Sequence, residues 1–176
     1  GFETDQPWGL EVTVPDGFDY SLADGQDRRV ASWTSQGVQF VDGARGGSLS
    51  DGKFAELWVP AGHRGPKFLL FKNFDVFKTY NRADSYALAV GLLSDEIARR
   101  APLQADWPRD LRPLTIDQVK QLQAALNTLG FEAGPVDGIA GRGTKGALRR
   151  FQVANGFIAD GFPTTEMLAY VLGAVR

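Results

Sequence analysis

The sequence predicts an α+β protein in which a β- and loop-rich first part precedes a helical last part. Residues 10–14 alternate between apolar and polar side chains and stop at a Pro-Asp-Gly turn, which is the pattern of a half-buried strand. Further along the chain, the apolar positions take a helical period in two separate regions. Between these regions, residues 99–113 hold three prolines and no periodicity, which indicates a linker. We therefore expect one domain over residues 1–98 and a second over residues 114–176.

The composition excludes several classes of protein. The 176 residues are 43% hydrophobic and 23% charged, which is typical of a folded globular chain. A net charge of -2 gives no broad basic surface for nucleic acid, and no apolar run is long enough to span a membrane. Cysteine is absent and His63 is the only histidine, which predicts an exposed, inert imidazole and no metal site or cofactor.

Short elements are expected in the first part. Residues 57–59 and 68–71 are brief apolar runs next to Pro or Gly, and both are predicted as strands. Residues 28–36 are predicted as a helix with Val30 and Trp33 facing inward. The Gly- and Ser-rich stretch that follows, residues 42–53, is predicted as a flexible loop.

One longer helix is predicted over residues 84–97, with Asp84 or Ser85 as its cap. Its expected inward face consists of Leu88, Ala89, Leu92, Leu93 and Ile97. Asp95 and Glu96 then belong to a solvated face.

The last part predicts three helices that repeat one pattern. In each copy a helix ends at Gly-Phe, an Asp-Gly turn follows, and a new helix begins after Thr. The first copy supplies Gly130, Phe131, Asp137, Gly138 and Thr144, and the second supplies Gly156, Phe157, Asp160, Gly161 and Thr164. A T-x-x-Q capping box at Thr115 and Gln118 begins the first helix.

This repeated text resembles the three-helix peptidoglycan-binding module of cell-wall enzymes, from about Pro113 to the C-terminus. The resemblance implies glycan strands and stem peptides as partners, with Phe131 and Arg142 as contacts. Arg142 would meet stem-peptide carboxylates. Residues that serve first as structural turns or caps are Asp137, Gly138, Thr144, Asp160 and Gly161.

A second stretch, residues 73–98, resembles the end of the catalytic domain of the lytic murein transglycosylase B family (glycoside hydrolase family 103). The family pattern is N-F-x-V-x-x-x-Y-N-x-S-x-x-Y-A-x-A-V. Matching positions are Asn73, Phe74, Val76, Tyr80, Asn81, Tyr86, Ala87, Ala89 and Val90, and the family serine is Ala83 here. Residues 7–23 are similar to the β-containing insert of that family. Residues 1–98 are thus expected to be the remnant of a lysozyme-like domain.

The family resemblance implies a reaction without net hydrolysis. The C6 hydroxyl of N-acetylmuramic acid attacks its own anomeric carbon, which releases N-acetylglucosamine and leaves a 1,6-anhydro product. One glutamate protonates the leaving oxygen and then accepts the hydroxyl proton, which requires a carboxyl that stays protonated near neutral pH. In the family this glutamate precedes a serine. None of the chain's six glutamates does.

We therefore expect the chain to be the C-terminal fragment of a transglycosylase from a Gram-negative periplasm, inactive alone but able to bind peptidoglycan. Its start, GFETDQ, has no initiator Met or leader pattern, as expected for a processed or excised product. By match to the pattern, Tyr80 and Asn81 would line the sugar sites, and Tyr86 would lie near the acid/base. Packing for the tyrosines and a turn for Asn81 are the simpler interpretations of the same residues.

Two alternative functions remain open. The chain can be a non-catalytic wall-binding or scaffold protein that keeps a truncated transglycosylase-like domain. It can also pair with the missing N-terminal part of its own catalytic domain to rebuild an active cleft, in which case apolar surface around residues 68–71 would be uncovered.

Overall fold

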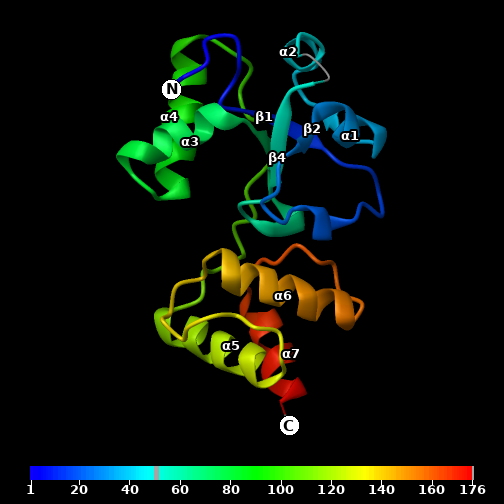
Figure 1. The fold of residues 1–176 in the computed structure, drawn as a ribbon, viewed down its shortest axis with the longest axis vertical. Coiled ribbons are helices and arrows are strands. Elements are labelled where there is room, and N and C mark those ends of the chain that lie inside the picture. Colours follow the sequence, from blue (N-terminus) through cyan, green and yellow to red (C-terminus); the bar gives the residue numbers. More distant parts are fainter. Residues whose placement is uncertain (50–51, 176) are drawn as a thin grey trace. The chain divides into compact units, whose positions relative to one another are not determined.

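A computed structural model describes residues 1–49 and 52–175 and divides the chain into two compact units (Figure 1). The first unit contains residues 1–18, 25–59 and 66–106. The second contains residues 19–24, 60–65 and everything from Trp107 onward. Two short segments of the N-terminal part thus belong to the C-terminal unit. None of the described helices is long and apolar enough to cross a membrane.

A five-stranded antiparallel sheet organises the first unit, with the strand order β2-β4-β5-β1-β3. The strands are β1 (Gly9–Thr13), β2 (Arg28–Arg29), β3 (Gln39–Phe40), β4 (Phe54–Trp58) and β5 (Lys67–Leu70). Leu69 in the central strand β5 lies opposite Leu10 on one side and Leu57 on the other, and all three are buried. The three predicted strands are therefore confirmed. The two-residue strands β2 and β3 were not predicted, because pairs this short carry no period.

Four helices accompany the sheet, namely α1 (Val30–Ser35), α2 (Gly43–Gly47), α3 (Lys72–Tyr80) and α4 (Asp84–Ile97). The predicted helix over residues 28–36 is confirmed as α1, except that Arg28 and Arg29 form strand β2 instead. The Trp33 indole donates to the Ala55 carbonyl at 2.8 Å. Helix α2 contradicts the predicted loop over residues 42–53, because the Asp42 side chain caps a short helical turn. Positions 50 and 51 of that loop lie outside the described residues.

Helix α4 has the predicted bounds but a different buried face. Ala87, Leu88 and Gly91 are buried, whereas Leu93 and Ile97 are 60% and 76% exposed. The N-cap is Ala83, with no capping side chain, so the predicted cap at Asp84 or Ser85 is wrong. The reason for the changed face is local packing: a Cβ at Gly91 would lie 2.5 Å from the Trp8 ring, so the indole lies directly against the helix backbone.

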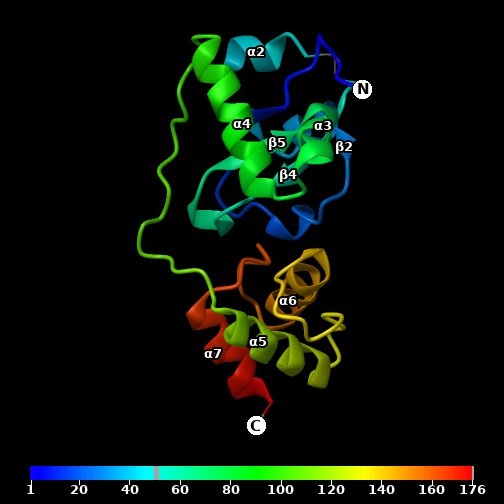
Figure 2. The same ribbon diagram turned by 90° about the vertical axis from the view of Figure 1, so that its left-hand side faces the viewer.

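The core of the first unit is aromatic. Trp8 packs against Phe68 of β5 and Phe74 of α3, with ring centroids 5.9 and 6.1 Å apart. Leu70, Ala87 and Leu88 complete the buried cluster, so β5, α3 and α4 share one core (Figure 2).

The second unit is built on α5 (Ile116–Thr128), α6 (Arg142–Ala154) and α7 (Thr165–Ala174), with single 3-10 turns at Tyr20–Leu22 and Gly62–Arg64. The three helices enclose an apolar core (Figure 1). Its fully buried members are Leu122, Leu126, Ala147, Leu148 and Val171. The capping box at Thr115 and Gln118 is confirmed, and so is Thr164 as the cap of α7.

The prediction for Thr144 was wrong. Helix α6 begins at Arg142, with Gly141 at the N-cap position, so Thr144 lies inside the first turn. Its side chain is buried, and its hydroxyl accepts from the Gln123 amide at 3.0 Å. The hydroxyl also lies 3.3 Å from the Ile139 carbonyl, and these interior contacts take the place of a cap.

Candidate functional site

Tyr80, Asn81 and Tyr86 come together at the junction between α3 and α4. The rings of Tyr80 and Tyr86 are 5.9 Å apart, and Tyr80 is 85% exposed. Asn81 Oδ1 accepts from the Ala83 amide at 2.9 Å, which makes an Asx turn that redirects the chain into α4. The turn therefore accounts for Asn81 structurally, while the exposed Tyr80 ring and the partly buried Tyr86 ring offer an apolar face to a ligand.

Asn73, the first residue of the matched pattern, has a role that the sequence did not indicate. It is fully buried, and its amide group donates to the carbonyls of Glu3 and Gln6 at 2.7 and 2.6 Å. Its Oδ1 accepts from the Glu3 amide at 2.8 Å. One side chain thus fastens the N-terminal segment to α3.

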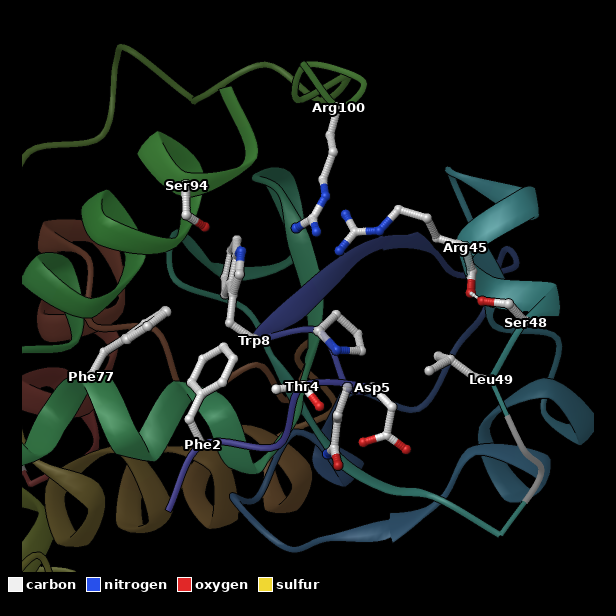
Figure 3. Close-up of a pocket in the computed structure, with 12 residues that line it drawn as sticks. Phe2, Thr4, Asp5, Trp8, Arg45, Ser48, Leu49, Phe77, Ser94 and Arg100 are labelled. Atoms are coloured by element: carbon white, nitrogen blue, oxygen red, sulfur yellow. Dashed lines mark hydrogen bonds between the residues drawn. The ribbon is translucent and has the colours of Figure 1, made fainter. Parts of the chain in front are cut away.

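That segment forms one side of a cavity of about 370 Å³ in the first unit (Figure 3). Figure 3 shows the rings of Phe2, Trp8 and Phe77 together, with the guanidinium groups of Arg45 and Arg100 converging nearby. Asp5 also lines the cavity, so it combines an apolar wall with charges of both signs.

Asp95 contacts three residues that line this cavity, which contradicts its predicted place on a solvated face. Its Oδ2 accepts from the Trp8 indole at 3.0 Å, and its Oδ1 lies 2.6 Å from Arg100 and 3.7 Å from Arg45. The side chain is only 14% exposed. Asp95 therefore orients both arginines and the indole, whereas its neighbour Glu96 is exposed as predicted.

The glutamates have structural or surface positions. Glu11 accepts from the backbone amides of Gln104 and Ala105 at 2.8 and 2.7 Å, which ties the middle of the predicted linker to β1. Glu3 pairs with lysines, and Glu96, Glu132 and Glu166 are exposed. Among the residues that the structure describes, no glutamate lines the cavity of about 370 Å³, whereas Glu11 lines a smaller cavity of about 40 Å³ that also borders Trp8.

In the second unit, a buried glutamine organises the first Asp-Gly turn. Gln123 Nε2 donates to Asp137 Oδ1 at 2.9 Å, and Gln123 Oε1 accepts from the Gly138 amide at 2.9 Å. Asp137 also accepts from the Ile139 amide, and these hydrogen bonds hold the pKa of its carboxyl below the usual range. Gly138 has a φ of +80°, as its place in the turn requires.

The second turn repeats this arrangement. Gln152 Nε2 donates to Asp160 Oδ1 at 3.0 Å, and Gln152 Oε1 accepts from the Gly161 amide at 2.7 Å. The predicted turn roles of the two aspartates and their glycines agree with this geometry. The two glutamines were not predicted, although each directly follows a buried apolar residue, Leu122 or Phe151.

His63 is not inert. Its backbone amide and its Nδ1 both contact Asp160 Oδ2, at 2.9 and 2.7 Å, so the segment 60–65 is tied to the second turn. Gly62 allows this approach, because its φ is +69° and a Cβ there would lie 2.7 Å from that oxygen. Burial and, to a lesser extent, the charge of Asp160 raise the pKa of Tyr20, whose ring packs edge-on against the imidazole.

The two predicted contacts of the last part, Phe131 and Arg142, lie on the surface of the second unit. Arg142 is exposed at the start of α6, and Phe131 is half-buried with its ring 5.5 Å from Phe151. Among the described residues, no group of three histidine, aspartate or glutamate side chains is placed to hold a metal ion.

Comparison with known proteins finds two family models along the chain. One, described as "Transglycosylase SLT domain", matches residues 1–95. The other, described as "Putative peptidoglycan binding domain", matches residues 115–170. A search of curated proteins finds no match.

Two solved structures of SltB3 from Pseudomonas aeruginosa are similar to the chain. One is in complex with NAG-anhNAM-pentapeptide and is 42% identical, with a TM-score of 0.88 over 98% of this chain. The other, with NAG-NAM-pentapeptide, is 43% identical, with a TM-score of 0.88 over 97% of this chain. The chain spans 46% of the length of each.

Proposed function

The chain belongs to the transglycosylase SLT domain family, and on this basis we propose that it is the C-terminal part of a peptidoglycan lytic transglycosylase. The observation that carries the proposal is the order of the two family matches, together with 42% identity to SltB3 over 98% of the chain. The membrane-bound lytic transglycosylase B group is the proposed subfamily, because the Asn73–Val90 pattern matches it. A Gram-negative periplasm is the proposed location, in keeping with the organism of the SltB3 structures.

In this proposal the chain binds peptidoglycan and the cleaving glutamate comes from elsewhere. None of the chain's glutamates has the Glu-Ser context, and among the described residues none lines the cavity of about 370 Å³ in the first unit. Tyr80, Asn81 and Tyr86 would form part of the sugar-binding wall. A complete enzyme would then give 1,6-anhydro-N-acetylmuramic acid without net hydrolysis.

Residues 114–176 are the proposed wall-binding domain, with residues 99–113 as the linker and residues 1–98 as the catalytic-domain part. Phe131 and Arg142 are its proposed contacts with glycan and stem peptide. A non-catalytic wall-binding scaffold is the second candidate function, and the same lack of a Glu-Ser motif favours it.

The test is a pulldown of the 176-residue chain on enzyme-free sacculi, with mass spectrometry of the supernatant. We expect retention on the sacculi and no anhydro-muropeptides. Anhydro products would show that the chain holds a working acid/base, and Glu56 and Glu96 would be mutated first. Absence of retention would refute the binding function for this chain.

A further inference from the structure

A cavity of about 360 Å³ in the second unit has no assigned role. Part of its lining is apolar and comes from the segment after α6 and from α7, namely Phe157, Met167 and Tyr170. The rings of Phe157 and Tyr170 are 4.9 Å apart, and Tyr170 remains 50% exposed. An aromatic surface that borders a cavity and stays open to solvent is a usual component of a ligand site.

The same cavity is lined by charges of both signs. Arg64 makes two hydrogen bonds to Asp110, at 2.8 and 3.0 Å, and both side chains are about half exposed, at 49% and 63%. Glu166 lines the same cavity as this pair. The hydrogen bonds and charge of Asp110 raise the pKa of the Arg64 guanidinium, and the charge of Glu166 adds a smaller effect. One cation thus faces two carboxylates, which leaves a net negative charge beside the apolar wall.

Arg64 is held in this position by its neighbour His63. Two contacts from His63 reach Asp160 Oδ2, and Asp160 Oδ1 is itself fixed by Gln152 and the Phe162 amide. Asp160 is 7% exposed, so this anchor is nearly buried. The cavity therefore presents its guanidinium from a rigid support rather than from a free loop.

We propose that this cavity binds the amino-acid head group of the diamino acid in a peptidoglycan stem peptide, an inference that rests on the proposed function. Such a head group carries an ammonium and a carboxylate at the end of an aliphatic stem. The ammonium meets Glu166, the carboxylate competes with Asp110 for Arg64, and the stem lies on Phe157 and Tyr170. Separating an exposed ion pair such as Arg64–Asp110 costs little free energy, so the ligand carboxylate can replace Asp110 as the partner of Arg64.

A neutral sugar is the competing occupant, because a pyranose can stack on the same rings. A sugar would leave the Glu166 carboxylate without a counter-ion. The net negative lining therefore favours the zwitterion, whose ammonium can pair with Glu166. The site is also distinct from the surface proposed above at Phe131 and Arg142, since neither residue lines the cavity.

The inference is tested by NMR titration of the full ¹⁵N-labelled chain with three probes. These are a muramyl tripeptide that ends in a diamino dicarboxylic acid, the same tripeptide with its side-chain amine acetylated, and a tetramer of N-acetylglucosamine. We expect the first probe to shift the amide signals of residues 63–64, 157 and 166–170, and the acetylated probe to bind about fivefold more weakly. Equal binding of the two tripeptides, or shifts at this cavity from the sugar alone, would overturn it.

Two variants complete the test. Glu166→Gln should weaken tripeptide binding about fivefold, whereas Asp117→Asn, which removes a carboxylate from the first turn of α5, should not. Tyr170→Ala should weaken it about tenfold, with Val153→Ala on α6 as the matched truncation. Sacculus retention by the wild type with no loss in Glu166→Gln or Tyr170→Ala would overturn the inference and leave the proposed function intact. Failure of the wild type to bind sacculi would refute both.

Discussion

At the scale of single residues, Gln123 and Gln152 have the same structural role in the two repeats. Each donates to a turn aspartate and accepts from the amide of the glycine after it. A primary amide suits this position because it offers a donor and an acceptor in one plane, whereas a carboxylate only accepts. The two side chains thus convert neighbouring loops into fixed parts of a small three-helix core.

Gln123→Ala should therefore destabilise the second unit by about 2–3 kcal/mol, because it leaves the Gly138 amide and the Thr144 hydroxyl without their buried partner. Native-state hydrogen exchange of the α5 and α6 amides measures the loss. Gln121→Ala, on the exposed side of the same helix, is the control and should cost less than about 0.5 kcal/mol. Similar protection in the two variants would show that the turn does not depend on Gln123.

In the first unit, Asp95 has a comparable structural role. Asp95→Ala removes the acceptor of the Trp8 indole and the counter-ion of Arg45 and Arg100, and we expect a loss of about 2 kcal/mol. Urea unfolding followed by tryptophan fluorescence measures it. Glu96→Ala, at the adjacent exposed position, should leave the midpoint nearly unchanged. A shift of the same size in both variants would assign the effect to α4 itself and not to the Asp95 contacts.

At the scale of elements, the sequence predicted those whose pattern is local. The bounds of α4, the capping box of α5 and the turn glycines follow from spacing and cap chemistry alone. Helix α3 was not predicted, because its Phe, Val, Thr and Tyr residues favour strands. In the structure it buries Asn73 and Phe74.

The site residues that were not predicted from the sequence were missed for one common reason. Asp95 depends on partners at positions 8 and 45, and His63 depends on Asp160, and no sequence window contains both members of such a pair. The junction residues Tyr80, Asn81 and Tyr86 could be brought together from the pattern because they lie within seven positions. Whether they contact sugar remains a prediction.

The helical period of α4 was predicted correctly, but its buried face was not. Because Trp8 lies against Gly91, the inward side is rotated toward Ala87 and Leu88, which leaves Leu93 and Ile97 on the surface. Leu88→Ala should cost about 2 kcal/mol, whereas Leu93→Ala should cost less than about 0.5 kcal/mol. Thermal unfolding by circular dichroism compares the two variants of this chain. Equal costs would contradict the rotation of the buried face.

At the scale of the whole molecule, the compact units and the matched families divide the chain differently. The peptidoglycan-binding match covers residues 115–170, yet the second unit also takes residues 19–24 and 60–65 from the part matched by the transglycosylase family. The link is chemical, since the buried Asp160 carboxylate receives two contacts from His63. The bounds of the peptidoglycan-binding family match therefore omit two segments that belong to the same compact unit.

A piece that starts at Trp107 tests this division. Without residues 60–65, Asp160 Oδ2 loses both contacts in a nearly buried site, which should cost about 1–2 kcal/mol. For a domain of this size, that loss should lower the Tm by about 5–10 °C relative to the same helices in the intact chain. The temperature dependence of the NMR signals of α5, α6 and α7 gives both values. His63→Ala in the intact chain keeps the backbone amide, so its Tm should lie between that of the piece and that of the intact chain. An equal Tm for the piece and the intact chain would show that residues 60–65 contribute no stability.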